Sequence, residues 1–175
     1  MDIMSADQRS RLMSRIQAKD TGPELALRRL LHATGYRYAL HGSLPAKALA
    51  TLRAQHPGIR FRGGKLPGSS DLVFSARLKA VFVNGCFWHG HDCKVGLRRP
   101  SSNTGYWNPK LDANIARDHR NQQDLLALGW QYLTVWECEL RDVDKILLRA
   151  AEFLGPPDQG EHPASRLRNG ELPTP

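Results

Sequence analysis

Two thiols and two imidazoles lie close together in the segment Asn84-Gly-Cys-Phe-Trp-His-Gly-His-Asp-Cys93. Structural zinc takes four nitrogen or sulfur ligands in a closed tetrahedron. Cys86, Cys93 and one of the histidines supply three ligands, and Cys138 supplies the fourth if the ends of two strands are neighbours. We therefore predict a structural Zn²⁺ site that uses all three cysteines of the chain. The alternative is a core position for Cys138 and exposed histidines.

Zinc needs only one of His89 and His91, so the other imidazole is left beside the metal site. A free histidine at a strand end is a candidate general base. These residues alone do not choose between the two. Asp71, at the start of a predicted strand, lies in the right part of the chain to hold a catalytic cation near this base.

Asp118 lies on the apolar stripe of a predicted helix, where an ionised carboxylate is costly without a partner. We expect it to orient a histidine or a metal-bound water. The alternative is a carboxylate on the helix surface that pairs with Arg117 or Arg120.

Aromatic side chains lie near basic ones. Phe87 and Trp88 are adjacent, so they cannot both face one side of a strand, and Trp107 follows a loop that contains Arg98 and Arg99. Aromatic groups flanked by basic residues are suited to stacking on nucleobases or wedging between them.

The elements that position these residues form an α/β pattern. Short runs rich in Val, Phe and Leu predict a β-hairpin over 71–75 and 79–84, and a third strand over 131–138. Trp130 and Trp136 belong to this alternating third strand, and we expect both in the core. The order helix, hairpin, helix, strand, helix predicts a mixed sheet flanked by helices. Apolar periodicity places the helices at 21–35, 47–55, 111–129 and 143–154.

The 175 residues are enough for one domain with a real core. We expect a basic arm at 1–20, a single domain at 21–154 with an insertion or long loop at about 43–65, and a disordered Gly/Pro-rich tail at 155–175. The net charge of +8 favours a polyanionic partner, although a basic surface can also serve solubility alone.

No apolar run reaches the roughly 18 residues of a membrane span, and the first residues lack the apolar core of a secretory signal. We therefore expect a soluble cytoplasmic protein with no membrane partner. An odd number of thiols in a reducing compartment favours metal ligands over disulfides.

Short motifs are spread over residues 9–141. They are Arg11-Leu-Met-Ser-Arg15, Asp20-Thr21 with Glu24, Leu66-Pro-Gly68 before Asp71, NGCFWHGHDC, Tyr106-Trp107, Asn114 with Arg117-Asp118, and Leu128-Gly-Trp130 leading to Val135-Trp-Glu-Cys138. Together they resemble the very short patch repair endonucleases, which are bacterial DNA mismatch endonucleases with a restriction-endonuclease-like fold. Members of that family nick DNA beside the T of a T·G mismatch left by deamination of 5-methylcytosine.

The resemblance implies a catalytic role for several residues. Asp71 would bind Mg²⁺ together with the backbone carbonyl of Val83, and His89 would activate the attacking water. Asp118 and Glu24 would support the hydrated metal cluster. The capping-box spacing Thr21-Gly-Pro-Glu24 explains Glu24 equally well.

The resemblance also assigns the zinc ligands and a DNA wedge. It implies structural zinc on Cys86, His91, Cys93 and Cys138. The side chains that would be inserted at the mismatch are Met13, Phe87, Trp88 and Trp107.

This sequence departs from the family pattern in three ways. Ser70 precedes Asp71 where relatives commonly have Pro, and Val83 and Asn84 replace the usual Thr and His. A backbone ligand tolerates Val, whereas loss of a histidine behind the ligands alters metal affinity or rate. The third departure is the long segment at 43–65, which precedes the catalytic strand.

We therefore expect a Mg²⁺-dependent endonuclease that acts as a monomer on double-stranded DNA with a T·G mismatch, near the bacterial nucleoid, with mismatch-repair proteins as candidate partners. Two alternatives remain open. One is a zinc-stabilised DNA-binding module that does not cut, and the other is a nuclease of the same fold that serves restriction or a mobile element.

Overall fold

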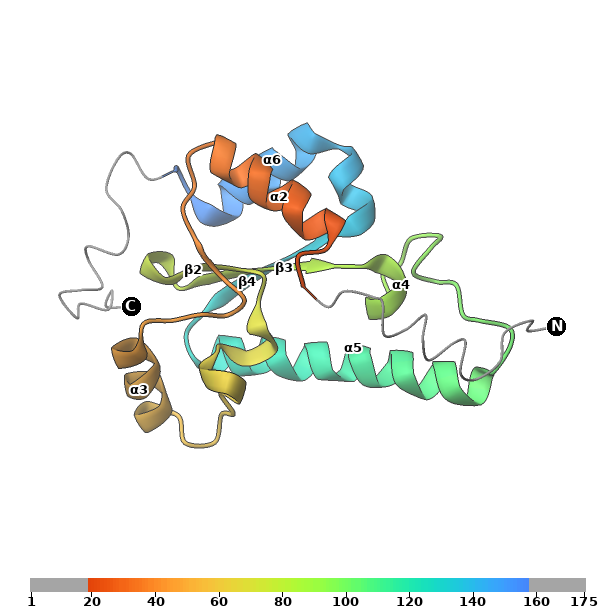
Figure 1. Cartoon of the computed structure of the whole chain (residues 1–175), viewed down its shortest axis with the longest axis horizontal. Coiled ribbons are helices and arrows are strands. Elements are labelled where there is room, and N and C mark those ends of the chain that lie inside the picture. The colour runs from red at the N-terminus through yellow and green to blue at the C-terminus, as the bar shows by residue number, and fades with distance from the viewer. Residues whose placement is uncertain (1–18, 158–175) are drawn as a thin grey trace.

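The computed structural model describes residues 19–157 (Figure 1). Most of the expected basic arm, including Met13, and the expected tail from residue 158 onward lie outside these residues. Within the described part of the chain, no helix is long and apolar enough to cross a membrane.

A four-stranded sheet with the order β1-β2-β3-β4 forms the centre of the fold. The predicted hairpin is present, because β2 (Leu72–Phe74) pairs antiparallel with β3 (Lys79–Asn84). The short strand β1 (Ala39–Leu40) extends it on one side, and β4 (Gln131–Trp136) pairs parallel with β3 on the other. The mixed α/β class is therefore confirmed.

The third strand is shorter than predicted. β4 ends at Trp136, and Cys138 lies in the following 3₁₀ turn, Glu137–Arg141. Asn84 is the register partner of Trp136, so β3 and β4 end side by side. The segments after the two strands therefore emerge at the same edge of the sheet, which brings Cys86 and Cys138 to one place.

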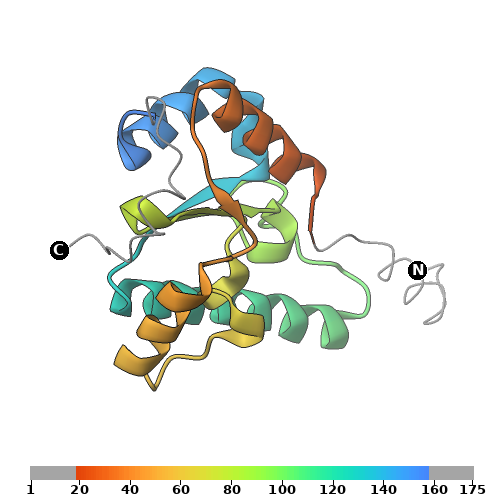
Figure 2. The same ribbon diagram turned by 60° about the vertical axis from the view of Figure 1, so that its left-hand side comes forward.

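Helices cover both faces of the sheet (Figures 1 and 2). On one face lie α2 (Gly22–Ala33) and α6 (Val143–Leu154). On the other lie α3 (Ala46–Gln55) and α5 (Thr104–Ala127), and α5 starts earlier than the predicted apolar stripe. The one-turn helix α4 (Cys86–His89) follows β3 directly.

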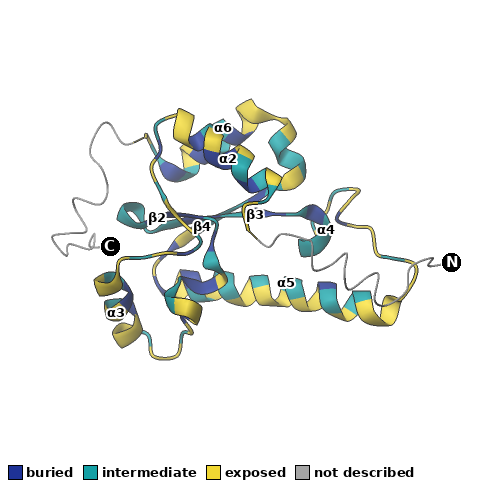
Figure 3. Ribbon diagram, viewed as in Figure 1, coloured by how far each residue is buried: buried dark blue, intermediate teal, exposed yellow. Residues whose placement is uncertain are grey.

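The core lies on both faces of the sheet, and Figure 3 shows buried stretches in the strands and in the helices on either side of them. Leu72 and Val81 pack with apolar residues of α2 and α6, whereas Val73 and Ala80 pack with those of α3 and α5. Each fully buried aliphatic side chain stabilises the fold by roughly 1.5–3 kcal/mol. The sheet is therefore a rigid platform for the residues that follow its strands.

The two tryptophans expected in the core differ. Trp130 is buried in the cluster against α5, as predicted. Trp136 is only half-buried and stacks on the ring of His91, with 4.4 Å between ring centroids. The core prediction for Trp136 is wrong because the strand ends there and its side chain covers the Cys/His cluster instead.

Candidate functional site

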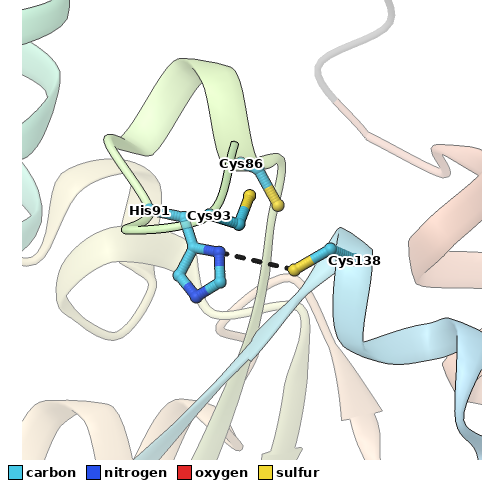
Figure 4. A group of neighbouring side chains, drawn as sticks. All are labelled: Cys86, His91, Cys93 and Cys138. Carbon is cyan, nitrogen blue, oxygen red and sulfur yellow. Dashed lines mark hydrogen bonds between the residues drawn. The ribbon is translucent and has the colours of Figure 1, made fainter. Parts of the chain in front are cut away.

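Four side chains with metal-ligand chemistry converge beyond the ends of β3 and β4 (Figure 4). One ligand atom from each of Cys86, His91, Cys93 and Cys138 can be chosen so that all lie within 4.8 Å of one another. Three sulfurs and one nitrogen in this arrangement match the donor set of a structural zinc site. The structure therefore brings together all the residues predicted to bind zinc.

The loop that carries His91 and Cys93 closes through a close backbone contact. A Cβ on Gly96 would lie 2.2 Å from the carbonyl oxygen of His91, so only glycine fits there. The backbone N–H of Gly96, with help from His91, lowers the pKa of Cys93 to about 6. Burial raises the pKa of Cys86 to about 12. One thiol of the cluster is thus prepared for the thiolate form that metals bind.

The two histidines of this segment face different partners. His91 Nδ1 lies 3.4 Å from Cys138 Sγ. His89 Nδ1 lies 2.5 Å from Asp118 Oδ2 on α5. Gly90, with a φ of 67°, ends α4 between them and redirects the chain. The fold therefore separates a histidine of the cysteine cluster from one that faces α5.

Asp118 makes the two contacts that the sequence offered as alternatives. Its Oδ2 contacts His89, and its Oδ1 lies 3.7 Å from a guanidinium nitrogen of the exposed Arg117. The histidine contact is much shorter and less exposed, so it is the stronger restraint on the carboxylate.

His89 and Asp118 line a cleft of about 610 Å³ that also contains Glu24, His41 and Asp71. Asp71 immediately precedes β2, and its Oδ2 accepts a 2.7 Å hydrogen bond from the backbone N–H of Val83 on β3. Burial, reinforced by the nearby charge of Glu24, raises the pKa of Asp71 to about 6. A carboxyl group with this environment in a cleft is a candidate functional group.

Glu24 is buried and does not complete a capping box with Thr21. Its carboxylate accepts hydrogen bonds from the backbone N–H of Asp20, from Thr21 Oγ1 and from Arg28, at 2.9, 2.9 and 3.1 Å. The Thr21 side chain makes no capping hydrogen bond to the helix. The capping explanation for Glu24 is therefore insufficient, and its carboxylate instead faces Asp71 across the cleft.

His41 is a candidate site residue that the sequence does not indicate. A ligand atom of His41 lies within 4.8 Å of one on Glu24 and one on Asp71, so the three could hold a metal ion. His41 follows β1 with a φ of 55°, and its backbone N–H donates to the carbonyl of Asp71 at 3.2 Å. Its signal in the sequence is weak, because it stands alone beside Gly42 at the edge of a poorly patterned segment.

Three aromatic rings meet beside this cleft, and we call them the aromatic cluster. Trp88 lies 5.0 Å from Phe87 and 6.1 Å from Trp107 between ring centroids, and all three are half-buried. Phe87 and Trp88 lie on α4 rather than on a strand, and Trp107 lies in the first turn of α5. Trp88 also lines the cleft itself.

Comparison with known proteins gives a consistent result. Residues 1–53 and 44–95 match the family DNA mismatch endonuclease Vsr. The chain is 40% identical over 155 residues to the Type II nicking enzyme V.XorIIP of Xanthomonas oryzae pv. oryzae. These residues are 89% of this chain and 98% of that protein. It is 32% identical over 145 residues to the DNA mismatch endonuclease Vsr of Escherichia coli, covering 83% and 79%.

The mixed sheet, the cleft and these relatives together define the class of protein as a DNA endonuclease with a mixed α/β fold. The chain belongs to the DNA mismatch endonuclease Vsr family. The predicted resemblance to the very short patch repair endonucleases is thereby confirmed. The alternative of a DNA-binding module that does not cut is disfavoured.

Proposed function

We propose that the protein nicks one strand of duplex DNA beside the T of a T·G mismatch left by deamination of 5-methylcytosine, and so starts very short patch repair. The position of Trp88 carries this proposal, because it belongs to the aromatic cluster and lines the same cleft as Asp71 and His89. A base step opened by the cluster would lie next to the hydrolytic groups. Strand-specific nicking of a labelled T·G duplex tests the proposal.

The donor set beside Asp71 fits a hard divalent cation. Carboxylate oxygens of Asp71 and Glu24 are ligands that Mg²⁺ prefers, and the carbonyl of Val83 belongs to the residue whose N–H already holds Asp71. When bound, Mg²⁺ would neutralise charge that develops on the phosphate. Asp71 and Glu24 would hold the cation, and His41 would provide a nitrogen ligand or orient the carboxylates.

His89 would take a proton from the attacking water. Its Nδ1 faces Asp118, so the Nδ1–H group donates a hydrogen bond to the carboxylate. Nε2 is then the ring nitrogen that accepts the proton of water. Asp118 would fix the ring orientation and stabilise the imidazolium that forms. Asn114, whose amide donates to the Trp88 carbonyl at 3.3 Å, would help hold α4 against α5.

The proposal also covers the metal centre and the setting. Zinc on the four Cys/His ligands would stabilise a restriction-endonuclease-like fold without taking part in hydrolysis. We propose a monomer that acts on double-stranded DNA at the bacterial nucleoid in the cytoplasm, with mismatch-repair proteins as partners. Met13 would complete the wedge from outside the described residues.

Several relatives favour a second candidate function. V.XorIIP and V.NmeAIP of Neisseria meningitidis, which is 34% identical over 141 residues, are named Type II nicking enzymes. Service to a restriction system is therefore a candidate role. Cleavage that needs a mismatch distinguishes repair from nicking of correctly paired recognition sequences.

We expect His89→Ala and His91→Ala to fail in different ways. His89→Ala should abolish nicking while DNA binding and the melting temperature are retained, because His89 contacts Asp118 and not the cysteine cluster. His91→Ala should lose zinc, stability and activity together. Nicking, zinc content and thermal melts are measured for both variants. If His89→Ala loses zinc and His91→Ala keeps it, the assignments are reversed.

We expect Trp88→Ala to remove much of the preference for mismatched over matched duplex. A mispaired step costs less to unstack than a paired one, so insertion of an aromatic ring favours the mismatch by a few kcal/mol at most. Phosphate contacts are equal on both duplexes, so the slope of log K against log salt should stay nearly constant.

Arg98→Ala and Arg99→Ala are the matched controls for Trp88→Ala, because both arginines are exposed on the loop before α5. They should reduce the magnitude of the slope of log K against log salt by about 0.9 per lost contact and leave the mismatch preference intact. Titrations of matched and T·G duplexes over a range of salt concentrations measure both quantities. An unchanged mismatch preference in a folded Trp88→Ala protein contradicts the wedge.

A further inference from the structure

The charged side chains of the segment 43–65 are all basic. It contains five cationic side chains and no carboxylate. Within residues 19–157 none of the five forms an ion pair. All but one are exposed. The cations are Lys47, Arg53, Arg60, Arg62 and Lys65. This is an uncompensated positive surface, which favours a polyanion.

The segment is firmly attached to the body of the domain. Leu49, Leu52 and Phe61 are buried against Leu125 and Trp130. An antiparallel bridge between residues 43 and 65 closes the base of the segment. Apolar side chains therefore face inward, and the cations stand on a fixed support instead of a freely moving loop.

The base of the segment adjoins the cleft. The backbone N–H of Gly42 donates to the carbonyl of Ser70 at 2.7 Å, directly before Asp71. Gly68 and Ser69, which follow the segment, line the cleft. The basic surface is therefore continuous in the chain with the residues that position Asp71.

Helix α5 relates this surface to the aromatic cluster. Trp107 lies near its first residue, Asn114–Gln122 contribute to the cleft, and Leu125 contacts the basic segment. In Figure 1, α4 and α3 lie toward opposite ends of α5. The 24 residues of α5 span about 36 Å at 1.5 Å per residue, close to one turn of B-form DNA.

We propose that residues 43–65 form a second DNA-binding surface, which contacts backbone phosphates of the duplex that flanks the cleft, up to about one helical turn from the aromatic cluster. The inference rests on duplex DNA as the substrate of the proposed function. Phosphate contacts carry no base information, so this surface sets affinity, register and salt dependence but not mismatch preference.

The test compares two triple variants on a matched duplex of about three helical turns. Lys47→Gln/Arg60→Gln/Arg62→Gln neutralises exposed cations of the segment. The control neutralises three exposed cations on the side of α2 and α6. It is Arg29→Gln/Arg141→Gln/Lys145→Gln. The magnitude of the negative slope of log K against log salt should decrease by about 2.7 in the first variant, at about 0.9 per lost contact. It should decrease by much less in the control.

Equal slopes for the first variant and the wild type overturn the proposal, as does an equal fall in the control. Thermal melts establish that both variants are folded, and Lys47→Gln alone, with an expected fall of about 0.9, replaces the triple variant if that one unfolds. Because the slope is measured on matched DNA, it is independent of nicking. Failure of the wild type to nick a T·G duplex would refute the proposed function and leave this result standing.

Discussion

Asp71→Asn should abolish nicking and yet make the protein more stable at neutral pH without added Mg²⁺. Burial raises the pKa of Asp71 to about 6, so its ionised form is unfavourable in the folded protein. Asparagine has nearly the same size and keeps an oxygen for the N–H of Val83. Loss of the carboxylate that would hold the cation should lower the nicking rate on the order of 10³-fold or more.

The stability gain should depend on pH in a defined direction. In the unfolded chain Asp71 has a pKa near 3.8, and in the folded protein it has a pKa of about 6. The stability that the protonated Asp71 carboxyl contributes to the folded state is complete below pH 3.8. It is lost as the pH rises to about 6. The advantage of Asp71→Asn should therefore be near zero at pH 3.5 and reach at most about 3 kcal/mol above pH 6.

Denaturant unfolding across this pH range measures the difference. Asp144→Asn, at an exposed position in the first turn of α6, is the matched control and should gain no stability. A destabilised Asp71→Asn at pH 7, or one that still nicks, would contradict this account of the cleft.

Cys93→Ala should release the bound zinc and lower the free energy of unfolding by several kcal/mol. Zinc on the four proposed ligands would tie the loop after α4 to the turn after β4, and no disulfide joins these segments within the described residues. Structural zinc contributes its binding free energy to folding, on the order of 10 kcal/mol in small zinc-dependent peptides. The larger core here retains part of the fold, so we expect a smaller loss.

Zinc content by elemental analysis and unfolding curves test this prediction. His119→Ala is the matched control, because His119 is exposed on α5 and is not a member of the Cys/His cluster. It should keep wild-type zinc and wild-type stability. Wild-type protein that purifies without zinc, together with a Cys93→Ala variant that melts at the same temperature, would show that the centre is not a zinc site.

The sequence predicts β2, β3, β4 and the flanking helices, but it predicts neither β1 nor the one-turn helix α4. The runs rich in Val, Phe and Leu in β2 and β3 and the apolar stripes of the flanking helices are local signals, and they predict the hairpin and the order of elements. The composition of the Cys/His segment indicated a metal cluster for a similar reason. Cys138 can join it only if the ends of two strands are neighbours, and the parallel pairing of β3 with β4 meets this condition.

The features that sequence could not supply depend on contacts between distant segments. The choice between His89 and His91 is made by the turn at Gly90, which directs one ring to α5 and the other to Cys138. His41 joins Glu24 and Asp71 only through the pairing of β1 with β2. No local pattern encodes either result, because each depends on which segments become neighbours.

Cleavage of duplexes that differ at one base pair tests whether nicking depends on the mismatch. With Mg²⁺ present, otherwise identical labelled duplexes carry T·G, U·G or C·G at that position. We predict a nick in the strand that carries the T, beside that base, and no nick in the C·G duplex. The U·G duplex shows how far the thymine methyl group contributes. Equal nicking of C·G and T·G, or no nicking of T·G by folded and zinc-loaded protein, would contradict mismatch-dependent cleavage.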